Sequence, residues 1–235
     1  LNAVKLNDLV CTVRINCFIR INAFFATDTS GNNVTATAPG SLPGYRADLF
    51  GKDIMKPHLV SWDLDMNSET LTLSFSEVVR ARTLTPTALT LQQFRNGSTS
   101  LSNFTLSGGS SASSNGLILV LDLATVDKDS IKKRTLCASN TTCFLSFSAE
   151  LIVDMAFDGQ PPNPAVPILH DTAEQVSAYV YDQTRPELAF FTLDYNDAVS
   201  NKVLLNLVFT EPVNLRTFDV TGLQLQTNQY DDTVK

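Results

Sequence analysis

Apolar and polar residues alternate along several short stretches of the chain. Within residues 70–75, leucine and phenylalanine alternate with threonine and serine, a period typical of a strand with one buried face. The segment 126–134 has acidic residues early and basic residues late, which predicts one short helix. Stretches rich in serine and glycine (107–116) or in proline (159–167) predict loops. Related patterns predict further strands at 88–91, 104–106, 116–123, 144–153 and 176–181.

The sequence contains an internal repeat. The segment that starts at Pro57 and the segment that starts at Pro186 carry similar residues in the same order. The matched pairs are Pro57 with Pro186, Leu59 with Leu188, Trp62 with Phe191, Asp65 with Asp194, Asn67 with Asn196, Phe75-Ser76-Glu77 with Phe209-Thr210-Glu211, Leu89 with Leu223 and Leu91 with Leu225. A second match relates Cys11, Cys17, Phe18 and Asp28 to Cys137, Cys143, Phe144 and Asp154. The two matches together predict a repeat of about 130 residues.

The phase of this repeat divides the chain into three parts. Residues 57–185 form one complete repeat, residues 1–56 are the C-terminal part of a preceding repeat, and residues 186–235 are the N-terminal part of a following one. Neither end supplies the piece that corresponds to about 104–126. We therefore expect either a stretch of a longer tandem array or a subunit whose residues 186–235 complete a composite domain with residues 1–56 of a neighbour.

Composition narrows the function classes. Of 235 residues, 43% are hydrophobic and 17% charged, which allows a packed core and argues against wholesale disorder. The net charge of −7 argues against a basic surface for nucleic acid or anionic membrane. No apolar run approaches the 18 residues of a membrane-spanning helix.

Short strands, frequent turn residues and one helix per repeat predict an all-β protein made of tandem Ig-like β-sandwich repeats. The linker between Tyr181 and Arg185 is short, so we expect a stiff rod rather than beads on a flexible string.

The repeated pattern L-x-L-x-F-[ST]-E-x-V, followed by T-x-L-x-L-Q and a serine- and glycine-rich hairpin, resembles bacterial Ig-like and SwmB-type cell-surface repeats. The stretch 145–155 followed by Gly159 is similar to the end of those repeats, and residues 26–32 match it in the preceding copy. The resemblance implies tandem extracellular sandwiches with an architectural or adhesive role, and it transfers no catalytic residue. The cysteine pairs and the glycosylation sequons depart from the bacterial pattern and suggest a eukaryotic secreted version.

Cys11 with Cys17 and Cys137 with Cys143 are candidates for local disulfides. A six-residue separation allows the Cα–Cα distance of about 4.4–6.8 Å that a bridge needs, and such a short loop stabilises by about 2 kcal/mol. The alternative is four buried free thiols. The spacing differs from that of a zinc site, and no histidine is nearby in sequence.

Four N-x-[ST] sequons, at Asn33, Asn96, Asn103 and Asn140, predict N-linked glycans. Together with the cysteines they predict an extracellular or cell-surface glycoprotein.

Glu77 belongs to the repeated F-[ST]-E motif and is a weak calcium candidate together with Asp65 and Asn67. The alternative is that Asp65 and Asn67 form a turn between strands and Glu77 accepts hydrogen bonds. We expect the alternative, and hence no metal site.

Trp62 and Phe191 occupy equivalent positions in the repeat. An exposed aromatic ring could stack on a sugar, but the alternating strand around Trp62 favours a core position.

No motif of nucleophilic, metal-dependent or nucleotide chemistry is present, and only His58 and His170 are available for proton transfer. We expect no enzyme.

The sequence thus predicts a structural glycoprotein that builds an extracellular filament or surface appendage by head-to-tail stacking of sandwiches. Its predicted partners are copies of itself or adjacent repeats, with no nucleic acid and no membrane span. The alternative is an adhesin-type module that binds carbohydrate or a cell surface, with calcium as a candidate ligand.

Overall fold

A computed structural model describes residues 2–7, 10–37, 44–96, 102–134, 136–156, 161–197 and 202–226. The chain forms two compact units, Leu1–Gln183 and Thr184–Lys235. Strands predominate in both, as the all-β prediction requires. Gly97 and Ser98 of the second sequon, and residues 157–160 of the predicted proline-rich loop, lie outside the described residues.

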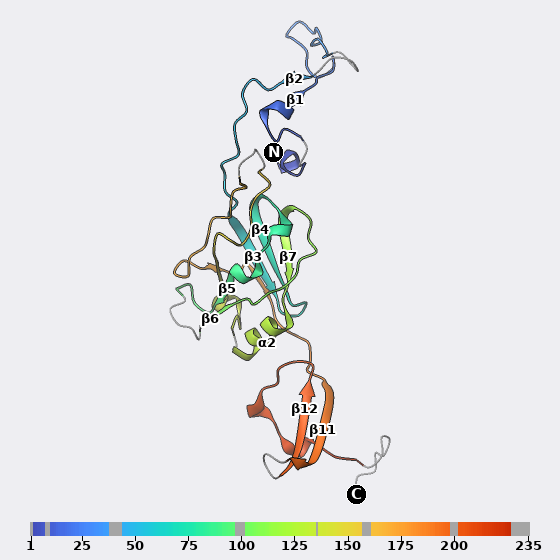
Figure 1. The fold of residues 1–235 in the computed structure, drawn as a ribbon, viewed down its shortest axis with the longest axis vertical. Helices are drawn as coiled ribbons and strands as arrows, with labels where there is room; N and C mark the ends of the chain where they lie inside the picture. The colour runs from blue at the N-terminus through green and yellow to red at the C-terminus, as the bar shows by residue number, and fades with distance from the viewer. Residues whose placement is uncertain are drawn as a thin grey trace. The chain divides into compact units, whose positions relative to one another are not determined.

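The first sheet of unit Leu1–Gln183 has four strands in the order β10-β3-β4-β7. Its strands β3, β4 and β7 lie side by side in Figure 1. Its members are β3 (Leu59–Asp65), β4 (Thr70–Val79), β7 (Gly116–Asp122) and β10 (Ala178–Val180). Strands β3, β4 and β7 are antiparallel neighbours, whereas β10 runs parallel to β3. The alternating pattern of 70–75 therefore lies in the central hairpin of this sheet.

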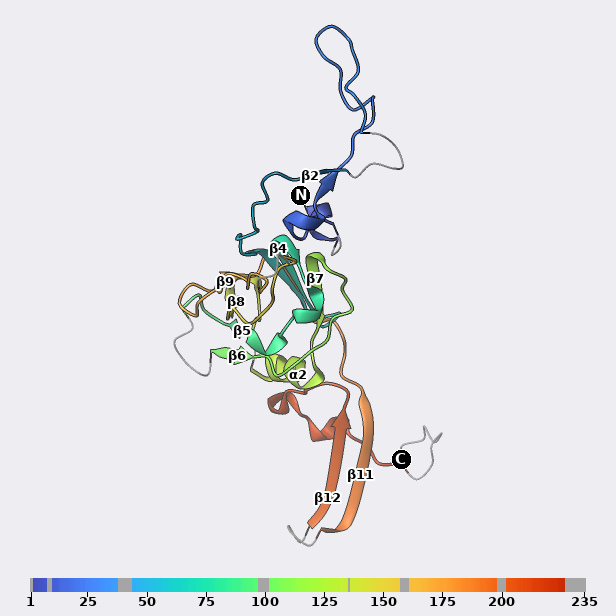
Figure 2. The same cartoon turned by 45° about the horizontal axis from the view of Figure 1, so that its top comes forward.

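The second sheet has the order β6-β5-β8-β9 (Figure 2). Its members are β5 (Leu89–Gln92), β6 (Asn103–Thr105), β8 (Phe144–Phe147) and β9 (Glu174–Gln175), and every pair is antiparallel. Two short 3₁₀ turns, η2 (Ala81–Thr83) and η3 (Pro86–Ala88), carry the chain from β4 to β5.

One hydrophobic core lies between the two sheets. Trp62, Leu71 and Leu73 from the first sheet and Leu91 and Leu145 from the second are almost completely buried in the same cluster. Burial of about 25 cal/mol per Å² of apolar surface makes this cluster the main source of stability. Trp62 is part of the core, as the alternating strand predicted.

The predicted helix is present as α2 (Thr125–Arg134). Its Asp127 carboxylate is fully buried and accepts hydrogen bonds from the backbone N–H of Ser107 and Gly108 and from the Ser107 hydroxyl, at 2.6–3.2 Å. A buried carboxylate needs such donors. The helix thereby anchors the start of the serine- and glycine-rich stretch.

That stretch was predicted to be a loop, and the structure shows more order than this. Ser110 and Asp122 exchange backbone hydrogen bonds of 3.1 and 2.8 Å, and the Ser111 hydroxyl donates to the Val120 carbonyl. Gly109 approaches β7 so closely that a Cβ would lie 2.8 Å from the Asp122 carbonyl oxygen. The stretch therefore covers the outer edge of β7, which would otherwise offer unpaired backbone groups.

The strand predicted at 144–153 is shorter than expected. Strand β8 ends at Phe147, and Val153 makes only an isolated bridge to Pro164. Strand β10 likewise covers only the middle of the predicted 176–181.

The N-terminal part of this unit contains α1 (Asn2–Lys5), the 3₁₀ turn η1 (Arg14–Asn16) and the antiparallel pair β1 (Phe18–Ile19) and β2 (Tyr45–Arg46).

The described residues of unit Thr184–Lys235, 184–197 and 202–226, form one antiparallel hairpin and two 3₁₀ turns. The hairpin is formed by β11 (Leu188–Asp197) and β12 (Lys202–Phe209), and the turns are η5 (Leu215–Thr217) and η6 (Val220–Gly222). None of the helices in the described residues has the length and hydropathy needed to cross a membrane.

The core assignment predicts that two substitutions in the same unit change the free energy of unfolding by very different amounts. Leu91→Ala should lower the free energy of unfolding by about 2–5 kcal/mol, because Leu91 is fully buried. Val60→Ala, on the exposed side of β3, should change it by less than about 0.5 kcal/mol. Denaturant unfolding followed by the fluorescence of Trp62, the single tryptophan, measures both. Equal effects would contradict this core.

Candidate functional site

The hairpin β11–β12 reproduces the local structure of the hairpin β3–β4. Both are antiparallel, and each is followed by two 3₁₀ turns, η2 and η3 in the first case and η5 and η6 in the second. The second pair of turns starts 134 residues after the first, the same separation as between Phe75 and Phe209. The two stretches that the sequence repeat relates thus form the same elements in the same order as far as the second 3₁₀ turn, after which β5 follows in the first copy and residues 223–226 form no strand in the second.

The two hairpins differ in what covers them. Trp62 is 1% exposed and Leu91 is 0% exposed, whereas their equivalents Phe191 and Leu225 are 54% and 59% exposed. Among the described residues of unit Thr184–Lys235, no second sheet packs on the hairpin. The unit therefore presents an apolar surface, defined here as the half-sandwich face, which contains Leu188, Phe191, Leu223 and Leu225. Contiguous apolar faces of this kind mark interaction surfaces.

The N-terminal segment, residues 1–56, corresponds to the part of the complete sandwich that contains β8 and β9. Strands β1 and β2 pair Ile19 with Tyr45, and β8 and β9 pair Leu145 with Glu174. In each copy the next backbone bond also recurs, since the N–H of Ala47 donates to Cys17 and the N–H of Val176 donates to Cys143. Ile19 is 60% exposed, whereas Leu145 is fully buried.

An aspartate holds the same turn in both copies. Asp28 accepts hydrogen bonds from the backbone and the side-chain amide of Asn32, and these bonds lower the pKa of its carboxyl group. Asp154 accepts the same two bonds, at 2.8 Å each, from Asn163. The sequence comparison had matched the two aspartates but not their asparagine partners, because an insertion of five residues separates them.

Both cysteine pairs form disulfides. Each bridge closes over a 3₁₀ turn, η1 or η4 (Asn140–Thr142), and the first cysteine of each pair has a positive φ of 53° or 54°. The Cα–Cα distances are 4.0 and 4.2 Å, slightly shorter than the range expected from the spacing. Both bridges thus combine a left-handed first cysteine with a close approach of the two Cα atoms.

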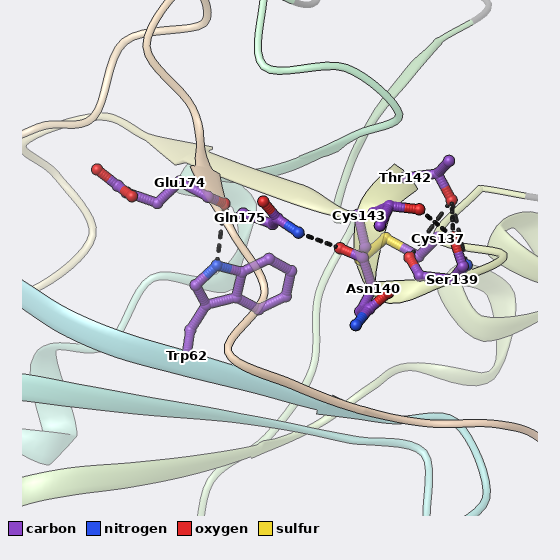
Figure 3. The surroundings of a disulfide bond; sticks show 9 residues. Trp62, Cys137, Ser139, Asn140, Thr142, Cys143, Glu174 and Gln175 are labelled. Carbon is purple, nitrogen blue, oxygen red and sulfur yellow. Dashed lines mark hydrogen bonds between the residues drawn. A yellow bond between two sulfur atoms is a disulfide. The ribbon is translucent and has the colours of Figure 1, made fainter.

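The Cys137–Cys143 loop is joined to the sandwich through β9 (Figure 3). The Gln175 side chain donates to the Asn140 carbonyl at 2.9 Å, and the neighbouring Glu174 carbonyl accepts the Trp62 indole N–H at 3.0 Å. The disulfide loop and the core tryptophan are therefore held by adjacent residues of one strand.

The calcium candidates do not come together. Asp65 accepts hydrogen bonds from the backbone N–H of Asn67 and Ser68 in the turn between β3 and β4, and the Ser68 bond is the main reason that the pKa of Asp65 is lowered. Glu77 lies toward the other end of β4, about 23 Å away at 3.3 Å per residue. The predicted turn is present, and the grouping of Asp65, Asn67 and Glu77 is wrong because the length of β4 separates them.

Glu77 instead joins a cluster that the sequence did not indicate. Carboxylate oxygens of Asp53, Glu77 and Asp154 lie within 4.8 Å of one another. The Lys5 ammonium is hydrogen-bonded to Glu77 and lies 2.6 Å from Asp53 Oδ2. Burial lowers the pKa of Lys5, but its bonds with Asp53 and Glu77 outweigh burial and hold that pKa above the ordinary 10.5. Lys5 therefore neutralises part of the acidic cluster, and α1 is tied to β4.

A similar ion pair occurs at the other end of the sandwich. Lys132 Nζ lies 2.9 Å from Asp182 Oδ2. Asp182 follows Asp53 by 129 residues, as Pro186 follows Pro57. The spacing Asp-x-x-[Lys/Arg]-Pro in both places is the signal that would have identified these aspartates from the sequence.

Three of the sequon asparagines, Asn33, Asn96 and Asn140, are exposed, and Asn103 in β6 is half-buried. Exposure is what a glycan requires.

A depression of about 410 Å³, lined by polar and apolar groups in similar measure, lies on the outer side of the sheet β6-β5-β8-β9, next to His170. Hydroxyl groups from Thr90, Thr105 and Ser146 line it. The Ser146 hydroxyl donates to Gln92 Oε1 at 2.6 Å, and His170 Nδ1 lies 2.9 Å from the same oxygen. Because an amide oxygen only accepts, this contact requires a proton on Nδ1, and Nδ1 then cannot take a proton from Ser146.

The Lys5 contacts predict a pH-dependent loss of stability. Lys5→Met should lower the free energy of unfolding by about 1–2 kcal/mol at neutral pH, because it leaves partly buried carboxylates without a counter-charge. The raised pKa of Lys5 means that this difference persists below pH 10.5 and shrinks as the pH rises through the folded-state value.

Denaturant unfolding of both proteins at neutral and alkaline pH measures this difference. Lys133→Met, at an exposed position of α2, is the control and should have little effect. A difference that is absent at neutral pH would refute the assignment.

No protein-family model matches the chain, and no curated protein matches it. Among solved structures, domains 1–6 of the surface layer protein SbsC match 61% of the chain with 13% identity and a TM-score of 0.32. The N-terminal part of the bacterial S-layer protein SbsC matches 66% with 13% identity and a TM-score of 0.30. The matches span 16% and 32% of those chains, and a likeness this low carries no conclusion about fold or function.

Proposed function

We propose that this chain is a structural glycoprotein of the cell surface, which builds an extracellular filament or appendage by head-to-tail joining of Ig-like sandwich repeats of about 130 residues. The half-sandwich face carries this proposal. Its side chains are exposed at positions whose equivalents form the core of the complete sandwich. Exposing this face to water is unfavourable, and a partner that covers it gains what the complete sandwich gains internally.

The equivalence of two segments with different parts of the complete sandwich supports head-to-tail joining. Unit Thr184–Lys235 contains equivalents of β3, β4, η2 and η3. The N-terminal segment contains equivalents of β8 and β9. Joining two such segments brings together the two layers of a sandwich. A repeated head-to-tail contact does not close on itself, and it therefore produces a filament.

The disulfides and sequons support an extracellular location. Disulfides persist in oxidising compartments, and exposed glycans would limit proteolysis and lateral aggregation. The proposed partners are copies of the chain or adjacent repeats, with glycans attached at Asn33, Asn96, Asn103 and Asn140.

The depression beside His170 favours a second function, that of an adhesin-type module that binds carbohydrate. Its hydroxyl groups suit a sugar, although its lining contains no tyrosine or tryptophan and its one phenylalanine, Phe147, is buried. Calcium would belong to this alternative, with the carboxylates of Asp53, Glu77 and Asp154 as the oxygen donors that lie together.

Electron microscopy and sedimentation of the secreted full chain test the first function. We expect regular fibres in the wild type, and Phe191→Asp should reduce the sedimenting fraction by at least about tenfold, because it places a charge in the face to be buried. Thr192→Asp, on the opposite face of β11, is the matched control and should assemble normally. Mass spectrometry of intact glycopeptides from the same sample reports sequon occupancy.

Dispersed chains with unmodified asparagines would contradict the structural function. Binding of such chains to a glycan array would then support the adhesin.

A further inference from the structure

The half-sandwich face ends in a stretch whose partner can be read from the complete sandwich. Residues Leu223–Gln226 follow η6 as β5 follows η3. In the complete sandwich, β5 pairs with β8, with Leu91 opposite Leu145 and Thr90 opposite Ser146. Residues 223–226 therefore require a segment that takes the place of β8 beside them.

Strand β1 has the structure that this place requires. Its pairing with β2 has the same register as the pairing of β8 with β9, and the same disulfide loop precedes it. Strand β8 bonds β9 along one edge and β5 along the other, whereas β1 belongs to a two-stranded sheet with β2 in the described part of the chain. The second edge of β1 is thus the counterpart of the edge that receives β5.

We propose that β1 of a second copy of this chain adds to residues 223–226 as an antiparallel strand, with Ile19 opposite Leu225 and Arg20 opposite Gln224. This inference rests on the proposed function, since it specifies the contact by which the copies join. The main-chain hydrogen bonds of the added strand would supply affinity, and the alternating side chains would fix the register.

Burial supports this register. Ile19 and Leu225 are each about 60% exposed, and their equivalents Leu145 and Leu91 are both fully buried in one cluster. Phe25, at the position of the buried Leu151, is also exposed. A single pairing therefore covers apolar side chains on both partners, which a register shifted by one residue would turn to the opposite face.

The second copy does not supply a counterpart of every strand in the complete sandwich. In the complete sandwich β4 pairs with β7 along its outer edge, and the described residues of the N-terminal segment contain no counterpart of β7. The outer edge of β12 is thus not covered by this contact.

A pair of cysteine substitutions tests the register in the full chain. Directly opposite residues in an antiparallel pair have Cα atoms about 4.5–5.5 Å apart, within the range of a disulfide. Arg20→Cys combined with Gln224→Cys should give covalent ladders of several chains on a non-reducing gel, with peptide mass spectrometry locating the link. Arg20→Cys combined with Asn206→Cys, an exposed position of β12, is the control, and its cross-linked fraction should be at least about tenfold lower.

The results for assembly and cross-linking distinguish the proposed strand register from the structural function on which it rests. Fibres in which only the first variant forms ladders support both. Fibres without a link between positions 20 and 224 overturn this register and leave the structural function in place. A link between these positions within one chain overturns the second copy as the partner. Chains that never assemble overturn the proposed function and the inference with it.

Discussion

The apolar face of a β-sheet has to be covered, and this requirement governs the rest of the structure. In unit Leu1–Gln183 the sheets β10-β3-β4-β7 and β6-β5-β8-β9 cover each other, and Trp62 and Leu91 lie in the shared core. In unit Thr184–Lys235 the equivalent positions, Phe191 and Leu225, face water. The same apolar positions are therefore buried in the first unit and exposed in the second. The assembly that we propose follows from this difference.

The N-terminal segment keeps its shape without a large core of its own. Strands β1 and β2 have two residues each, and such a pair is not stable alone. The Cys11–Cys17 bridge fixes the backbone before β1, and the bonds between Asp28 and Asn32 fix the backbone between β1 and β2. These local constraints resemble those of 137–163, and in the assembly that we propose they would lower the ordering entropy lost on binding.

Much of this architecture could be predicted from the sequence, because it depends on local patterns. Alternation at 70–75 indicated β4, the ordering of charges indicated α2, and the cysteine spacing indicated the two bridges. The calcium grouping failed because Asp65 ends β3 beside the start of β4, whereas Glu77 lies near the far end of β4.

The contact between Lys5 and Glu77 could not be predicted, since 72 residues separate the partners and the repeated F-[ST]-E motif that contains Glu77 does not indicate a lysine partner. The ordering of residues 107–115 along β7 depends on the backbone bonds between Ser110 and Asp122 and on bonds of the Ser111 and Ser113 hydroxyls with the Val120 backbone, and the composition of this stretch does not reveal these partners.

Hydrogen–deuterium exchange in assembled and dispersed material tests the central claim most directly. If the half-sandwich face is completed on assembly, the backbone amides of residues 223–226 should exchange at least about a hundredfold more slowly in fibres than in dispersed chains, because they enter a covered strand pair. The amides of β5 should be equally protected in both states. Equal exchange of residues 223–226 in fibres and in dispersed chains would contradict the account.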